Sequence, residues 1–342
     1  MRKLANVLYV TTPTAYLSLD GENAVVTDGD TPLGRVPLHN IEGIVYFGYK
    51  GASPALMGKC AQEGISLCFL SPTGKFLARV AGPIKGNVVL RQTQVLLSSG
   101  DEAVPIARNF LIGKLCNSKN VLRRALRDHA LRIDGQKVTE RIAIIDDSLS
   151  CLSQAQTIQE LMGFEGSAAK AYFDVFDDMI LRNKEKFVFA GRVKHPALDP
   201  VNAMLSLAYT VLGNEIAAAL ECVGLDPYIG FLHQMRPGRK SLALDMLEEL
   251  RAPFADRFVL TMINLGIITS DDFIVKENGT VLLKDEARKT FLSEWQKRKQ
   301  EIITHPFLKE KIKWGLVPYA QAVLMSRYMR ADIDAYPPFF WK

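Results

Sequence analysis

The sequence predicts an α+β protein, in which a small β-rich N-terminal domain is followed by a larger all-helical domain with one short β-hairpin. Short runs of β-branched and aromatic residues, separated by turn pairs, fill residues 1–95. Helical periodicity takes over from about Pro105. The length of 342 residues fits two domains, at roughly 150 residues per domain.

The β-rich domain is expected over residues 1–95. Turn pairs at Asp20–Gly21, Asp28–Gly29 and Thr73–Gly74 separate its strands, and one amphipathic helix over residues 53–64 interrupts them. No phosphate-binding glycine loop follows any strand, which argues against a nucleotide-binding fold. The expected strands are ANVLYV, AYLSLD, NAVVTD, TPLGRVPL, IEGIVYFG, ISLCFLS and KFLARVAG.

The helical domain is expected over residues 105–330, after a junction at 96–104. Asp199 is a suitable N-cap and Pro200 a suitable first helical residue. Asn278–Gly279, between two short apolar runs, predicts the hairpin. The expected helices are 104–129, 148–162, 166–183, 201–223, 241–265 and 285–304.

Residues 331–342 form a separate C-terminal tail, which ends in YPPFFWK. Its two prolines exclude a helix there. Four aromatics in seven residues are unusual for a free tail. Two interpretations stay open: the tail packs against the chain's own body, or it docks onto a partner protein.

Composition is typical of a globular cytoplasmic protein, with 48% hydrophobic and 23% charged residues. The net charge of +5 permits a polyanionic partner without requiring one. The five cysteines include no CxxC pair, which argues against zinc knuckles, iron–sulfur clusters and a disulfide framework. The apolar stretch 201–225 contains Asn202, Asn214, Glu215 and Glu221, so we expect a buried core helix and no membrane span.

The run from Gly230 to Arg251 contains the candidate chemistry. His233 precedes a helix that carries Asp245 and Glu248 one turn apart, together with Glu249, on the side opposite an apolar stripe, with Ser241 as expected N-cap. Taken alone, this pattern favours an ordinary amphipathic helix with a solvated acidic face. Together with Glu165 upstream, however, one histidine and several carboxylates suit Mg²⁺ or Mn²⁺ better than zinc.

Basic residues accompany these acids. Arg236, Arg239 and Lys240 lie between His233 and the acidic helix, and six basic residues and no acid lie between Val104 and Arg127. A basic helix is often only a solvated face, but such residues can also neutralise phosphates. The candidates for DNA contact are Arg236, Arg239, Lys240, Arg123, Arg124 and Arg127.

Three blocks together resemble a known family: GFEGSAAKAYF, DPVNAMLSLAYTVL and GFLHQMRPGRKSLALDMLEELRAPFADR. In order and spacing they resemble CRISPR-associated protein one, the integrase subunit of CRISPR adaptation. The segments NVLYVTTPTAYLSLDGENAVV and LHNIEGIVYFGYKGASPALMGKC look most like its subtype I-C branch.

The resemblance implies a site. The family's metal ligands fall on Glu165, His233 and Glu248, where many relatives have Asp at the last position. It also marks Asp245 as a nearby catalytic acid in a supporting role. It leaves the division of labour between Asp245 and Glu248 open.

The resemblance also implies a metal-dependent DNA endonuclease and integrase that joins 3′-hydroxyl ends of a short duplex to the CRISPR repeat by transesterification. The implied partners are double-stranded DNA, a second copy through the β-rich domain, and CRISPR-associated protein two, a small ferredoxin-like dimer. An end-trimming nuclease is a further candidate partner. Two alternatives stay open: a DNA-binding scaffold without chemistry, and a repair nuclease acting on branched DNA outside CRISPR.

Overall fold

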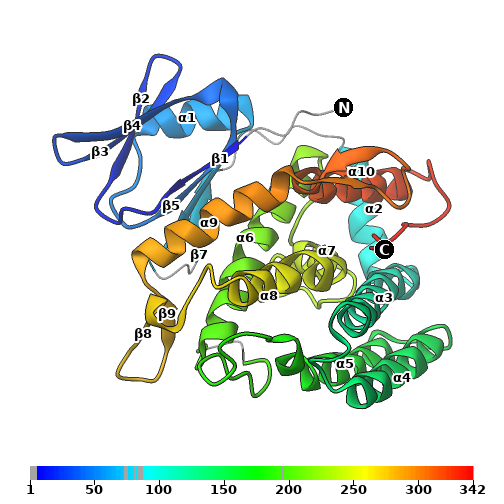
Figure 1. Ribbon diagram of the computed structural model, residues 1–342. Coiled ribbons are helices and arrows are strands. Elements are labelled where there is room, and N and C mark those ends of the chain that lie inside the picture. Colours follow the sequence, from blue (N-terminus) through cyan, green and yellow to red (C-terminus); the bar gives the residue numbers. More distant parts are fainter. Residues whose placement is uncertain (1–5, 73–75, 81, 83–87, 194–195, 342) are drawn as a thin grey trace. The chain divides into compact units, whose positions relative to one another are not determined.

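The computed structural model describes residues 6–72, 76–80, 82, 88–193 and 196–341 (Figure 1). The chain divides into two compact units. The first comprises Met1–Lys85, Lys284–Glu301 and Lys313–Leu316; the second comprises Gly86–Leu283, Ile302–Ile312 and Val317–Lys342. Segments 284–301 and 313–316, which the sequence assigned to the helical domain, belong to the first unit.

The first unit contains two sheets. A four-stranded sheet has the order β1-β5-β6-β7, in which the first two pairings are parallel and the third is antiparallel. The strands β2-β3-β4 form an antiparallel sheet. The strands are β1 Asn6–Val10, β2 Tyr16–Asp20, β3 Asn23–Asp28, β4 Thr31–Pro37, β5 Ile41–Phe47, β6 Ser66–Leu70 and β7 Phe76–Val80.

Helix α1, Pro54–Glu63, packs among these strands and forms where the sequence predicts it. Ser53 caps its first turn, and Gly64 ends it in the left-handed conformation at φ 72°. Tyr46 is fully buried and donates its hydroxyl hydrogen to the Ala15 carbonyl at 2.8 Å. The unit also contains α9, Asp285–Gln300, and the short turns η1, Leu38–Asn40, and η5, Trp314–Leu316.

The second unit is mainly helical, and α3, α4 and α5 lie side by side in it (Figure 1). Asp199 caps α6 with Pro200 as its first residue, as predicted. The helices are α2 Val88–Ser99, α3 Ala103–His129, α4 Gly135–Leu152, α5 Ile158–Asp174, α6 Pro200–Cys222, α7 Ser241–Leu250, α8 Arg257–Asn264 and α10 Val317–Met329. Short turns are η2 Asp177–Met179, η3 Arg251–Asp256 and η4 Ser270–Asp272.

Several predicted boundaries were wrong. The expected helix 148–162 is broken between α4 and α5, because Thr157 and Glu160 form a capping box that starts a new helix. The expected helix 166–183 ends at Asp174. Helix α2 was missed, since its sequence VVLRQTQVLLSS is rich in β-branched residues.

The predicted hairpin is present as β8, Phe273–Val275, paired with β9, Val281–Leu283. The expectation of a single hairpin was wrong, because β10, Ile302–Thr304, and β11, Lys311–Lys313, form another two-stranded sheet. The expected helix 285–304 stops at Gln300 for this reason. The predicted turn at Thr73–Gly74 lies outside the described residues.

Helix α6 is the core helix of the second unit. Within the described chain it is the one helix long and apolar enough to cross a membrane, but 56% of that window is buried inside the protein. Its buried residues include Val201, Met204, Leu207 and Leu212. Helices α7, α8 and α10 contact it. These contacts agree with the predicted buried core helix.

The C-terminal tail packs against the second unit itself. Tyr336, Phe339 and Trp341 are buried. The Asn117 side chain of α3 donates to the Phe339 carbonyl at 2.7 Å and accepts from the Trp341 amide at 2.8 Å. Asn120 donates to the Trp341 carbonyl at 2.7 Å. Of the two interpretations of this tail, self-packing is the one that the structure contains.

Candidate active site

The acidic side chains of α7 are buried, so the solvated acidic face suggested by its periodicity was wrong. Asp245 and Glu249 are 0% exposed and Glu248 is 4% exposed. Neighbouring helices cover α7, and α3 and α6 make extensive contact with it. Buried carboxylates require partners, and each of the three acids has a different set.

Asp245 holds the loop that carries His233. Its carboxylate accepts the backbone N–H groups of Phe231 at 2.7 Å, Leu232 at 3.1 Å and His233 at 2.9 Å. Gly230 permits this close approach, because a Cβ there would lie 2.8 Å from Asp245 Oδ2.

The start of α7 differs from the prediction. Ser241 is not the N-cap, because Lys240 holds that position. The Ser241 hydroxyl instead donates to the Gln234 carbonyl at 3.1 Å. The serine therefore ties the first turn of the helix to the loop that follows His233.

Asp245 also orients the imidazole of His233. Asp245 Oδ1 lies 2.7 Å from His233 Nδ1. A buried carboxylate in that position favours the tautomer with hydrogen on Nδ1, so Nε2 keeps its lone pair. The distance from Nε2 to Glu248 Oε1 is 3.9 Å. Such an arrangement prepares an imidazole as a metal ligand.

Glu248 lies among cationic groups. Arg251 Nη2 is 3.0 Å from Oε1, and Lys114 Nζ is 2.6 Å from Oε2. Burial alone would raise the pKa of Glu248, but Arg251, Lys114 and His233 outweigh it and lower this pKa to about 2. Glu248 is therefore a carboxylate across the physiological pH range.

Lys114 connects Glu248 to Glu165. Lys114 projects from α3, and its ammonium forms an ion pair with Glu165 Oε1 on α5 as well as with Glu248 on α7. Burial opposes the charged ammonium, but the charges of Glu248 and Glu165 overcome this effect and raise the pKa of Lys114. The amine stays protonated, and three helices meet at this charge cluster.

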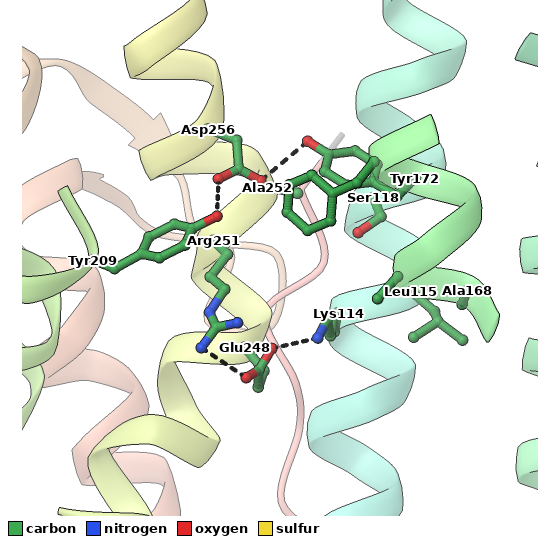
Figure 2. Close-up of a pocket in the computed structure, with 12 residues that line it drawn as sticks. Lys114, Leu115, Ser118, Ala168, Tyr172, Tyr209, Glu248, Arg251, Ala252 and Asp256 are labelled. Carbon is green, nitrogen blue, oxygen red and sulfur yellow. Dashed lines mark hydrogen bonds and ion pairs between the residues drawn. The ribbon is translucent and has the colours of Figure 1, made fainter. Parts of the chain in front are cut away.

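A pocket opens beside this cluster (Figure 2). Lys114 and Glu248 line one part of it, and Asp256 lines another. Asp256 Oδ1 accepts from the Tyr209 hydroxyl at 2.5 Å and Oδ2 from the Tyr172 hydroxyl at 3.1 Å. The Arg251 guanidinium carbon lies 4.9 Å from the centre of the Tyr209 ring, which supports its approach to Glu248.

Arg251 and Asp256 are the first and last residues of η3, a π-helical turn between α7 and α8. Pro253 lies inside this turn and supplies no backbone N–H, which favours a departure from regular α-helical bonding. The turn follows α7 directly and places Arg251 one turn after Glu248. The local sequence RAPFAD thus positions two residues of the site.

The donor chemistry of Glu165, His233 and Glu248 fits a divalent cation of the Mg²⁺ or Mn²⁺ type. Glu248 Oε2 is buried and lies 2.6 Å from the Lys114 ammonium. Within the described ranges, however, no three His, Cys, Asp or Glu side chains are close enough together to hold a metal ion. An ammonium lies between the two glutamates.

Four residues at this site were not predicted from the sequence: Lys114, Arg251, Tyr209 and Asp256. The spacing of three between Glu248 and Arg251 is a helical ion-pair signal that was available. Lys114 was counted only as one residue of a basic helix. Its role depends on how α3 packs against α5 and α7, and no local pattern reports that packing.

The candidate DNA-contacting residues fall into two groups. In the loop before α7, Arg236 is exposed, whereas Lys240 donates to Asn214 Oδ1 at 2.9 Å and Arg239 donates to the Gln234 carbonyl. On α3, Arg124 and Arg127 pair with Asp128, at 3.2 and 2.8 Å, and Arg123 lies 3.8 Å from Asp146. The α3 group is therefore partly neutralised.

The chain is similar to one protein family, both by a family model and by a curated relative. The family model described as CRISPR associated protein Cas1 matches residues 8–297. The chain is 47% identical over 343 residues to CRISPR-associated endonuclease Cas1 1 of Chlorobaculum tepidum, covering 100% of both chains.

Two solved structures share the fold. A casposase bound to integration product has a TM-score of 0.84 at 23% identity, over 99% of this chain and 95% of that one. A chain of a Cas6-RT-Cas1–Cas2 complex has a TM-score of 0.83 at 23% identity, over 100% of this chain and 36% of that one.

Proposed function

The chain belongs to the family of CRISPR-associated protein Cas1, and from this membership we propose a divalent-metal-dependent DNA endonuclease and integrase of CRISPR adaptation. The relatives' names identify the class of enzyme as an endonuclease. The proposed reaction joins the 3′-hydroxyl ends of a short duplex to the CRISPR repeat. One observation carries the proposal: a buried, ionised Glu248 lies beside an imidazole oriented by Asp245.

The proposed metal ligands are Glu165, His233 Nε2 and Glu248. The ion, Mg²⁺ or Mn²⁺, would lower the pKa of the attacking hydroxyl or water and neutralise charge on the transferring phosphate. Asp245 acts through His233, because its contacts with three backbone N–H groups and Nδ1 leave it committed to holding the loop. This division of labour makes Glu248 a ligand and Asp245 a positioning residue.

The strand-transfer step exchanges one phosphodiester bond for another, so it requires no nucleotide hydrolysis. The attacking 3′-oxygen forms a bond to phosphorus while the bond from phosphorus to the leaving 3′-oxygen breaks. A base accepts the proton of the attacking hydroxyl, and the leaving 3′-oxygen gains a proton. With water as the attacking group, the same step is endonuclease hydrolysis.

The proposed partners are double-stranded DNA, a second copy of the chain and CRISPR-associated protein two. The casposase complexed with its integration product and the Cas1–Cas2 complex support DNA and the small partner by likeness of fold. An end-trimming nuclease and the subtype I-C branch belong to the same proposal on the sequence resemblance alone, and a cytoplasmic location belongs to it on the composition of the chain.

Among the basic candidates, Arg236 is the one we favour for phosphate contact, because its side chain is exposed in the loop that follows His233. Arg239 and Lys240 have partners near that loop, and Arg123, Arg124 and Arg127 lie close to acids. Their contribution would require exchanging those partners for phosphate oxygens, which lowers the expected gain.

A strand-transfer assay on a supercoiled plasmid with a CRISPR repeat tests the function. With Mn²⁺ and the small partner protein, wild type joins a labelled duplex to the plasmid, and chelation abolishes joining. Glu165→Gln, His233→Ala and Glu248→Gln lose it, whereas Glu140→Gln, an exposed glutamate on α4, retains it. Joining that persists in the three site variants contradicts the site.

The same samples separate the alternatives. A protein that binds duplex DNA in a salt-sensitive way but neither cuts nor joins it with any divalent ion is a scaffold. Cleavage of branched DNA without preference for the repeat indicates a repair nuclease. Wild-type joining at the repeat, lost with the site variants, supports the integrase.

A further inference from the structure

A built-in cation lies between two of the proposed ligands. Lys114 Nζ contacts Glu165 Oε1 and lies 2.6 Å from Glu248 Oε2. Its side chain is only 12% exposed, and the two carboxylates are 23% and 4% exposed. The three side chains come from α3, α5 and α7, so the ammonium joins elements that are distant in sequence. Figure 2 shows its ion pair with Glu248.

This cation reduces the repulsion between the two carboxylates of the site. Glu165 and Glu248 are like charges in surroundings where water screens them poorly. Arg251 lies 3.0 Å from Glu248 Oε1 on the other side, and its charge interacts more strongly with Glu248 than with Glu165. Lys114 is the group that forms an ion pair with both carboxylates at once.

A divalent ion and an ammonium would make the same contacts. The ammonium contacts Glu165 Oε1 and Glu248 Oε2, and a divalent ion held by the same two glutamates would need these carboxylates as well. The ion gains oxygen ligands at roughly 2.0–2.2 Å, whereas an ammonium donates to them at roughly 2.7–2.9 Å. Both cannot occupy the space between the two carboxylates.

We propose that Lys114 is an internal competitor of the divalent ion. The ammonium holds Glu165 and Glu248 together in the metal-free protein, and it withdraws from between them when the ion binds. The inference rests on the proposed metal-dependent function. The pocket beside the cluster, which Lys114 lines together with Ser118, Tyr172 and Asp256, has room for a group of about the size of a water molecule, which is enough for the withdrawn ammonium (Figure 2).

The competition gives removal of Lys114 two effects of opposite sign. Without metal, a neutral residue at position 114 removes an ion pair from each carboxylate and leaves Arg251 paired with Glu248, so the melting temperature falls. With metal, the ion no longer has to displace an ammonium, so its affinity rises. If Lys114 only supported the fold, its removal would lower both the melting temperature and the affinity for the ion.

Mn²⁺ binding to the full-length chain, followed by the electron paramagnetic resonance signal of free Mn²⁺, measures the affinity. We expect Lys114→Met and Lys114→Gln to bind at least about tenfold more tightly than wild type, and to melt lower without Mn²⁺. Lys119→Met is the matched control, since Lys119 is on the same helix and pairs with Asp146 at 2.5 Å instead. Wild-type or weaker affinity in both Lys114 variants overturns the proposal.

A measurement on the wild-type chain covers the case in which both variants fail to fold. Lys114 is acetylated with an amine-reactive ester and quantified by peptide mass spectrometry. Saturating Mg²⁺ is expected to speed its labelling several-fold, because the ion releases the amine, while Lys119 labelling stays constant. An unchanged or slower rate at Lys114 contradicts the inference.

The outcomes distinguish this inference from the proposed function. If wild type binds no Mn²⁺, or if Glu248→Gln binds it as wild type does, the metal-ligand assignment fails. If Glu248→Gln abolishes binding while the Lys114 variants bind no more tightly than wild type, the assignment stands and only the competition is wrong.

Discussion

Glu248 and Glu249 are neighbours on α7 with the same side chain, and the protein gives their carboxyl groups opposite tendencies. Around Glu248, Arg251 and Lys114 overcome the effect of burial and lower the pKa to about 2. Around Glu249, burial raises the pKa to about 7. The difference shows that burial alone does not decide ionisation; the charge of the partners does.

The hydrogen-bond partners of Glu249 are neutral, and they belong to α10 and to the C-terminal tail. Its carboxyl oxygens accept from Gln321 at 3.0 Å, from the Tyr336 hydroxyl at 2.5 Å and from the Phe339 amide at 2.8 Å. Gly113 of α3 allows this close packing, since a Cβ there would lie 2.9 Å from Pro338. Glu249 therefore anchors the C-terminal tail, whereas Glu248 faces the candidate site.

The largest expected effect comes from exchanging the two glutamates for glutamine, one at a time. Glu248→Gln removes a charged ligand and should lower strand transfer roughly 10³-fold, because a metal-bound carboxylate stabilises charge worth several kcal/mol. Glu249→Gln should retain strand transfer within a few-fold under stable conditions. Initial rates of joining measure the effect of each substitution. Equal losses in the two variants would contradict the different roles of Glu248 and Glu249.

The next effect concerns stability against pH. The pKa of Glu249 is raised from 4.5 to about 7, so the folded state binds the proton more tightly than the unfolded state. Wild-type stability should therefore fall, relative to Glu249→Gln, as pH rises from about 4.5 to about 7, by about 3 kcal/mol. Urea unfolding of both proteins between about pH 4 and 8 measures this; parallel curves would contradict it.

A smaller effect is expected at Asp245. Asp245→Asn keeps the size of the side chain but weakens its acceptance of three backbone N–H groups and of His233 Nδ1–H. Outer carboxylates that orient a metal-binding histidine contribute roughly 10–100-fold to affinity or activity. Mn²⁺ titration and joining rates should both show such a loss. A loss as large as that of Glu248→Gln would make Asp245 a ligand.

The smallest effect separates two basic residues of one loop. Arg236→Ala should weaken duplex binding a few-fold and reduce the slope of log affinity against log salt by about one. Lys240→Ala should change the slope less, since Lys240 is held by Asn214 at 2.9 Å. Salt titrations of DNA binding compare them. Equal slopes for Arg236→Ala and wild type would exclude Arg236 as a phosphate contact.

The sequence predicted those parts of the fold that local chemistry decides. Asp199–Pro200 starts a helix and Asn278–Gly279 turns a hairpin because each acts through its own backbone conformation. The helix 104–129 was found within one residue of α3. Helix α2 was not predicted, because Val88–Ser99 combines a helical period with residues typical of strands.

The site was predictable only in part, for a physical reason. Periodicity put Asp245, Glu248 and Glu249 on one side of a helix and therefore suggested one solvated face. Their separate roles come from groups on other elements: the loop at His233, the lysine at 114, and the tail at Tyr336. Family resemblance named Glu165, His233 and Glu248, but it did not reveal the ammonium between two of them.

Anomalous diffraction at the manganese edge, from a crystal of the protein soaked in Mn²⁺, locates the ion and shows which side chains bind it. We predict one strong peak within roughly 2.0–2.6 Å of Glu165, His233 Nε2 and Glu248, with Lys114 withdrawn. A peak ligated by Asp245 or Glu249, or no peak while Lys114 stays between the glutamates at a saturating ion concentration, would contradict it.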